Sequence, residues 1–181
     1  DASGSSTAAF SNNIHTIITK GNYLFMGKYG DNTACSQVSG SAIGCELMVF
    51  DISSSTNPTY VAGRDESGSS GGTGNLRIYS LVIVGDYLYV GKSGYGTACS
   101  QTAGSAAGCE LMVYNISNPA SPTYVAGRDM SGNSTGTAVI DINNLIVVGN
   151  YLYVGKNSSS TACYQIAGSA AGCELMVFDI S

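Results

Sequence analysis

The sequence is poor in charge and has no tryptophan. Only 10% of its 181 residues are charged, and seven basic residues without a basic cluster stand against twelve acidic ones. This balance argues against a nucleic-acid partner, because Lys and Arg supply most contacts to phosphate backbones. No apolar run approaches the roughly 20 residues of a membrane-spanning helix, and no segment keeps a helical period of apolar residues. With 44% hydrophobic residues, the chain is still expected to build a folded core.

Signatures of catalysis and of cofactor binding are also missing. The sequence contains no phosphate-binding Walker loop, no haem-attachment Cys-x-x-Cys-His and no Gly-x-Ser-x-Gly nucleophile motif. His15 is the only histidine, and Tyr79 and Asn143 occupy its place in the repeats described below, so we interpret it as an ordinary loop or strand residue. We therefore expect no enzyme activity, no catalytic residue, no cofactor and no metal site.

Six cysteines form three pairs with nine residues between the members of each pair. The even count and the identical spacing predict one disulfide per pair, and no Cys-x-x-Cys motif indicates a metal. Each closed loop should stabilise the fold by about 2.5–3 kcal/mol through the entropy of the unfolded chain. Because such bonds persist in oxidising compartments, we expect a secreted or cell-surface protein. The predicted disulfides are Cys35–Cys45, Cys99–Cys109 and Cys163–Cys173.

One 64-residue unit recurs three times without insertion or deletion. The segment Gly85-Asp-Tyr-Leu-Tyr-Val-Gly-Lys92 has close matches 64 residues before it and 64 residues after it. Such a period is typical of repeat architectures, in which each unit forms one supersecondary structure. The third unit lacks the linker and strand that close the second, and the start at Asp1 without a signal-peptide pattern indicates a processed chain. The predicted repeats span residues 1–64, 65–128 and 129–181.

Each complete unit is predicted to form four strands. Gly85-Asp86 is a hairpin signal between the first two strands, and Pro119 and Pro122 mark the turn before the fourth. The Gly/Ser/Ala-rich segment with the cysteine pair separates the second strand from the third. In the second unit the predicted strands cover residues 81–84, 87–90, 110–116 and 123–126.

Both faces of the predicted strands are apolar or aromatic. Tyr87 and Tyr89 alternate with Leu88 and Val90, so the two pairs should lie on opposite faces. Near-continuous apolar strands are typical of sheets covered on both sides, whereas the short turns require antiparallel neighbours. The predicted fold is therefore all-β, with tandem four-stranded antiparallel sheets packed like β-propeller blades.

The strand segments resemble the LVIVD repeat of prokaryotic surface proteins. The resemblance lies in Leu81-Val-Ile-Val-Gly-Asp-Tyr-Leu-Tyr-Val90 and in Leu111–Val125, with its Asn115-Ile-Ser-Asn-Pro119 turn. It implies β-propeller blades and supplies no catalytic residues. Two features depart from the family pattern: the cysteine-bearing segment lengthens the unit, and three blades are fewer than the four to eight that typically close a propeller.

Three sets of charged residues recur at equivalent positions, and for each we predict a structural role. The lysines should discourage sheet stacking at an edge or turn. The glutamates should be solvated strand ends, with a channel ring or a Ca²⁺ site as the alternative. The aspartates should stabilise turns, since the further carboxylates of a calcium loop are missing. The sets are Lys28, Lys92 and Lys156; Glu46, Glu110 and Glu174; and Asp1, Asp65 and Asp129.

These features favour a structural extracellular protein, such as a subunit of a cell-surface filament or adhesive assembly. Three blades cannot close a ring, so the outer apolar faces should associate with copies of the same chain head-to-tail. The alternative is a secreted module that binds carbohydrate or another ligand through its repeated tyrosines. Asn115, Asn133 and Asn157 match the N-glycosylation acceptor pattern.

Overall fold

The computed structural model of the protein describes residues 13–30, 35, 44–66, 76–94, 99, 108–130, 140–157 and 172–181. Eleven strands in these ranges form three antiparallel sheets of four, four and three strands. The all-β fold of tandem antiparallel sheets, predicted from the sequence, is confirmed. Within the same ranges no helix is long and apolar enough to cross a membrane.

The first two sheets have the same topology, with strands in sequence order. The first sheet contains β1 (Ile14–Lys20), β2 (Tyr23–Lys28), β3 (Leu47–Asp51) and β4 (Thr59–Arg64). The second sheet contains β5 (Ile78–Val84), β6 (Tyr87–Lys92), β7 (Leu111–Asn115) and β8 (Thr123–Arg128). The four strands predicted for the second unit are all present, and their bounds differ from the prediction by at most three residues.

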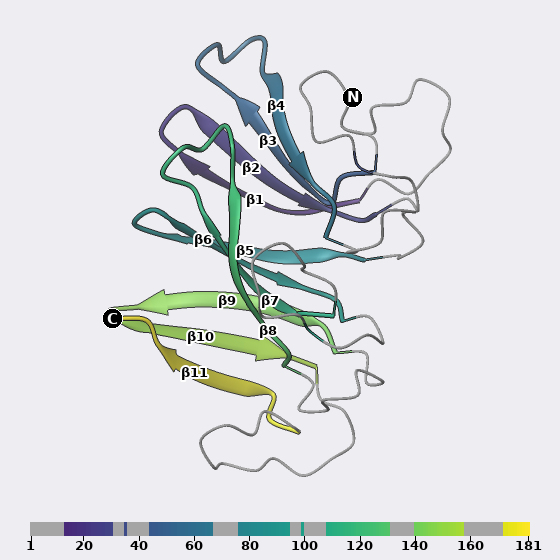
Figure 1. Ribbon diagram of the computed structural model, residues 1–181, viewed down its shortest axis with the longest axis vertical. Coiled ribbons are helices and arrows are strands. Elements are labelled where there is room, and N and C mark those ends of the chain that lie inside the picture. Colours follow the sequence, from purple (N-terminus) through teal and green to yellow (C-terminus); the bar gives the residue numbers. More distant parts are fainter. Residues whose placement is uncertain are drawn as a thin grey trace.

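The third sheet repeats the first three strands of this pattern. It contains β9 (Ile142–Val148), β10 (Tyr151–Lys156) and β11 (Leu175–Asp179), in the order β11-β10-β9. The three sheets lie within the predicted repeats, whose boundaries stay predictions. Figure 1 shows the sheets following one another like blades, with the C-terminus beside the third sheet.

The hairpin at the start of each sheet is fixed by a glycine with positive φ. Gly85 has φ 56° and joins β5 to β6, a conformation that residues with a Cβ seldom adopt. Gly21 and Gly149 occupy the same place, with φ of 56° and 59°. The first strands of neighbouring sheets then lie side by side, β1 with β5 and β5 with β9. This arrangement brings the faces of successive sheets together.

Candidate functional site: the joints between blades

The buried core is divided between two joints. We call the contact between the first and second sheets the first joint, and the contact between the second and third sheets the second joint. The first joint buries Phe25, Leu47 and Val49 of the first sheet against the second sheet. The second joint buries Leu111 of the second sheet with Leu152 of the third.

The middle sheet is covered on both faces, as its alternating strands predict. Leu88 and Val90 are fully buried in the first joint. Tyr89, which points to the opposite face, packs in the second joint together with Leu111. The faces of each joint therefore come from consecutive repeats, and a single sheet takes part in two different joints.

Each joint contains a contact between a glycine and an isoleucine. A Cβ built on Gly27 would lie 2.4 Å from Ile78 Cγ2, and one built on Gly91 would lie 2.5 Å from Ile142 Cγ2. Both isoleucines have 0% exposure. Only a residue without a side chain leaves room for the isoleucine of the next sheet, which accounts for a glycine within an apolar strand. Sequence reasoning missed this contact, although a strand glycine that recurs in each repeat is a signal for close approach.

A bulge at the start of each first strand directs this isoleucine into the joint. The pairing of β5 with β6 shifts register between Ile78 and Ser80, and β1 shows the same shift between Ile14 and Thr16. Such bulges re-aim side chains near the end of a strand. His15 lies in the β1 bulge, and its ring centroid is 5.2 Å from that of Tyr79 in the second sheet. The histidine is thus a strand residue that packs across the first joint, in agreement with its interpretation from the sequence.

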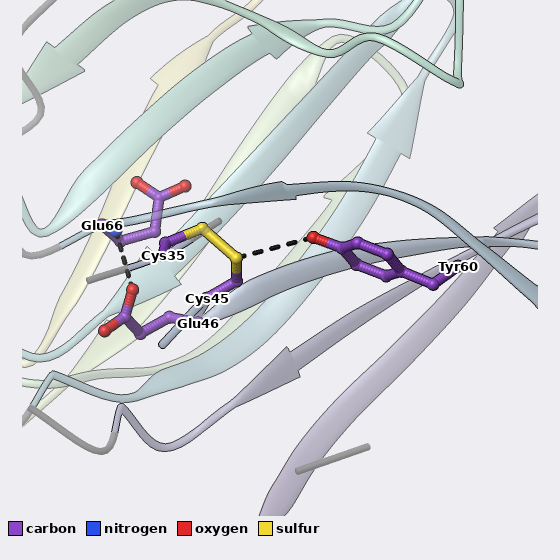
Figure 2. Close-up of a disulfide and its surroundings, with 5 residues drawn as sticks. All are labelled: Cys35, Cys45, Glu46, Tyr60 and Glu66. Atoms are coloured by element: carbon purple, nitrogen blue, oxygen red, sulfur yellow. Dashed lines mark hydrogen bonds between the residues drawn. A yellow bond between two sulfur atoms is a disulfide. The ribbon is translucent and has the colours of Figure 1, made fainter. Parts of the chain in front are cut away.

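The recurring glutamates connect consecutive repeats, and the prediction that they are solvated is wrong for two of them. Glu46 and Glu110 have 3% and 2% exposure. Glu46 Oε2 accepts a hydrogen bond of 2.8 Å from the backbone N–H of Glu66, as Figure 2 shows, and Glu110 Oε2 accepts one of 2.7 Å from Met130. Burial raises the pKa of Glu46 to about 8 and that of Glu110 to about 7. Each carboxyl group holds the start of the following repeat from inside the joint.

The recurring lysines are buried, so their prediction as edge or turn residues is wrong. Lys28 and Lys92 have 0% exposure and Lys156 has 5%. Each ends the second strand of its sheet, and its backbone N–H donates to the carbonyl oxygen of the recurring glutamate before the third strand. Lys156 Nζ donates a hydrogen bond of 2.5 Å to the carbonyl oxygen of Met130. Burial lowers the pKa of Lys92, against the opposing effect of Glu66 and Glu110.

The two joints differ in one buried pair. In the first joint, Tyr114 Oη donates to the carboxyl oxygens of Glu66 at 2.6 and 2.7 Å, and both residues are buried. Burial raises the pKa of Glu66 to about 7 and that of Tyr114 well above its ordinary value. In the second joint the equivalent residues, 64 positions later, are Met130 and Phe178, which pack in one apolar cluster. A polar pair and an apolar pair therefore occupy the same place.

The outer face of the third sheet is exposed although its sequence matches that of the covered faces. Leu175 is 64% exposed, whereas its equivalents Leu111 and Leu47 are 4% and 0% exposed. Val177, with 50% exposure, stands where Val49 is fully buried in the first sheet. Glu174 is exposed as well, unlike the two glutamates inside the joints. The third sheet thus presents one half of a joint.

The cysteines are arranged as the spacing predicts in the first two repeats. Disulfides join Cys35 to Cys45 and Cys99 to Cys109, with Cα–Cα distances of 4.4 Å in both. Cys173 is disulfide-bonded, while its predicted partner Cys163 lies outside the described residues. Cys45 Sγ lies 3.6 Å from Tyr60 Oη on β4 (Figure 2). The Cys35–Cys45 disulfide therefore also contacts the outer strand of its own sheet.

Of the predicted glycosylation sites, the structure describes Asn115 and Asn157. Asn115 Oδ1 accepts a hydrogen bond from the Ser117 backbone, and Asn157 Oδ1 accepts one from the Asp141 backbone. Asn133 and Asp1 lie outside the described residues. Among the described residues, no cluster of three or more His, Cys, Asp or Glu side chains is arranged to hold a metal ion.

A pocket opens between the second and third sheets, beside β8 and β11. Its lining includes Tyr89, Arg128, Phe178 and Asp179. The guanidinium carbon of Arg128 lies 5.9 Å from the ring centroid of Phe178. An aromatic ring with a cation and a carboxylate nearby is a combination suited to small polar ligands.

Comparison with known proteins agrees with the resemblance found in the sequence. A family model described as LVIVD repeat matches residues 106–128 and 141–159. These segments contain β7 and β8 of the second sheet and the β9–β10 hairpin of the third. No curated protein and no solved structure matches the chain.

Proposed function

We propose, on the premise that this chain carries LVIVD repeats in blade-like sheets, that it is a structural protein of an extracellular assembly. Its copies associate head-to-tail into a filament or adhesive layer at the cell surface. The proposal includes secretion, since disulfides persist in an oxidising compartment, and it assigns the chain no catalytic role.

The observation that carries the proposal is the exposed outer face of the third sheet. Ile146, Val148, Leu175 and Val177 of this sheet have exposures between 50% and 64%. A contiguous apolar face of this kind normally marks an interface. Contacts between different faces of identical chains give open filaments when the rotation does not close, and rings when it does. We favour the filament, because the repeats are strictly periodic, and a six-bladed ring of two chains is the closed form of the same contact.

Sedimentation velocity over a wide range of concentrations, followed by electron microscopy, tests the proposal. We expect the mean sedimentation coefficient to increase with concentration and linear particles to appear in the images. A single species with the mass of one chain at every concentration would contradict the proposal. The disulfides should remain oxidised throughout, because reduction destabilises each repeat independently of assembly.

A second candidate function, ligand binding, is favoured by the pocket beside Arg128. Carbohydrate-binding sites combine aromatic faces with charged or polar side chains, and Tyr89, Arg128 and Asp179 supply both kinds of group. A glycan array with the parent protein and with Arg128→Ala separates the two functions. Binding that Arg128→Ala abolishes, in a protein that remains a monomer, would favour the ligand-binding function.

A further inference from the structure

The two internal joints share a set of contacts that defines a docking unit. On one side of each joint stands a strand glycine, Gly27 or Gly91, and on the other side stands the isoleucine that packs over it. A second apolar residue follows three positions after the isoleucine, and Leu81 and Leu145 in this position have 8% and 7% exposure. In the second joint, the backbone N–H of Leu145 also donates a 2.9 Å hydrogen bond to Ser80 Oγ. We call the face that carries the glycine the receiver, and the face that carries the isoleucine and the second apolar residue the insert.

The third sheet repeats the receiver residues, and no described residue of another sheet lies over its glycine. Gly155 is equivalent to Gly27 and Gly91, yet among the described residues a Cβ built on it would have within 4 Å only atoms of Asn144, in its own sheet. Asn144 stands in the place of Ser80, so this position again carries a side-chain oxygen of the kind that accepts a backbone N–H. Leu175 beside it is 64% exposed. The face therefore has the shape and the polarity of the two occupied receivers.

The first sheet carries the two insert residues on its first strand, and among the described residues no receiver glycine lies against them. Ile14 is equivalent to Ile78 and Ile142, and it is 48% exposed where they are fully buried. Ile17 is equivalent to Leu81 and Leu145, and its exposure is 61%. The insert and the vacant receiver thus lie on opposite sheets of one chain and belong to the same kind of joint.

We infer that Ile14 and Ile17 of a second copy of this chain dock on the receiver face at Gly155, with Ile14 placed over the glycine as Ile142 is over Gly91. This inference rests on the proposed function and names the residues of the interface. The occupant is a copy of the chain because its first sheet carries the residue types that fill both internal receivers. The contact joins two different faces, so it is heterologous, and each copy contributes its insert to one neighbour and its receiver to another.

Two blocked variants test this assignment. Gly155→Val fills the receiver, and of the residues that the structure describes only Asn144 has atoms within 4 Å of the added Cβ. Ile14→Asp places a charge on the insert, at a side chain that is already 48% exposed. Val125→Asp is the matched control, because Val125 on β8 is 43% exposed and lies outside both end faces. Circular dichroism of each variant checks that the sheets remain folded, and Leu175→Glu blocks the receiver face if Gly155→Val disturbs its strand.

The readout is sedimentation of each variant alone and of the two blocked variants mixed in equal amounts. We expect each blocked variant to weaken self-association by about tenfold or more, and Val125→Asp to assemble like the parent. The mixture should form a discrete heterodimer, since the intact receiver of Ile14→Asp accepts the intact insert of Gly155→Val, and no further growth is possible.

The outcomes separate this inference from the proposed function. If the parent assembles and Ile14→Asp assembles equally well, the inference is wrong while self-association stands. The inference is also wrong if Gly155→Val and Leu175→Glu both assemble normally, or if the mixed variants remain monomers. A parent that never assembles overturns both.

Discussion

The two internal joints use the same apolar framework but differ in their polar contents. The first joint holds the buried Glu66–Tyr114 pair, and Lys20 Nζ also makes a 2.6 Å ion pair with Asp86. In the second joint, Met130 and Phe178 replace the buried pair, and Val84 and Asn150 occupy the places of the ion pair. The glycine–isoleucine contact and the glutamate–backbone bond occur in both. The shared contacts define how any two repeats stack, whereas the polar pairs distinguish one joint from the other.

The largest loss of stability is expected from charges placed on the two faces of the middle sheet. Leu88→Asp puts a carboxylate into the first joint at a position with 0% exposure, and should lower the free energy of unfolding by about 3–5 kcal/mol. Tyr89→Asp acts on the second joint and should cost less, because Tyr89 is only partly buried and lines the open pocket. Urea unfolding of both variants measures the difference. Equal stability of Leu88→Asp and the parent would contradict the assignment of this face to a buried joint.

The buried pair should behave as a unit in a double-mutant cycle. Tyr114→Phe removes the hydroxyl that donates to the Glu66 carboxyl group, and Glu66→Met leaves the Tyr114 hydroxyl buried without this acceptor. Each single change should cost about 1–3 kcal/mol. The double variant places the Met–Phe pair of the second joint into the first, and should recover most of the loss, because apolar replacement of a buried polar pair is often neutral. Additive losses in thermal or urea unfolding would show that the two side chains are not coupled.

Stability should fall as the pH rises from about 5 to about 8. The folded-state pKa of Glu66 is raised to about 7 and that of Glu46 to about 8, mainly by burial, so the folded protein binds these protons more tightly than the unfolded chain does. This contribution is fully present below the ordinary pKa of 4.5 and is lost as the pH rises through the folded values.

Lys92, Arg64 and Asp65 surround Glu66, and the lowered pKa of Lys92 acts in the opposite direction to the raised pKa of the carboxyl groups. Melting temperatures between pH 5 and pH 8 should therefore decrease in the parent and decrease less in the double variant Glu66→Met/Tyr114→Phe. Glu110→Gln serves as the comparison for the second joint, where burial raises the pKa of Glu110 to about 7. A melting temperature that rises over this range would be inconsistent with buried, protonated carboxyl groups.

The smallest loss of stability is expected from removal of the exposed ion pair of the first joint. Asp86→Asn introduces the residue type that the third repeat has at position 150, and removes the charge from a side chain that is 63% exposed. The loss should be below about 1 kcal/mol and should vanish at high salt, because solvent and ions screen such pairs. Unfolding at low and high salt measures it, and a salt-independent loss would point to the Lys20 bonds with the Gly85 and Ile116 carbonyls instead.

Patterns among neighbouring residues in the sequence predicted the strands and the sheets. They did not predict the contacts between repeats. The alternation around Leu88 and Tyr89 and the hairpin glycine at 85 depend on neighbouring residues only, so both were predictable. Lys92 and Glu110 look like exposed residues at strand ends, because nothing in the neighbouring sequence indicates that both are buried. The glycine–isoleucine contact joins residues 51 positions apart. The sequence signal of this contact is a glycine that recurs inside an apolar strand. The sequence signal of the buried pair is that Glu66 and Tyr114 both change in the next repeat, to Met130 and Phe178.

The most direct test of head-to-tail stacking is a cryo-electron microscopy structure of the assembled protein. The predicted result is a contact between the third sheet of one copy and the first sheet of the next, with Ile14 over Gly155 and the same relation between sheets as in the internal joints. A contact between two third sheets, or between faces that leave Gly155 open to solvent, would contradict the account.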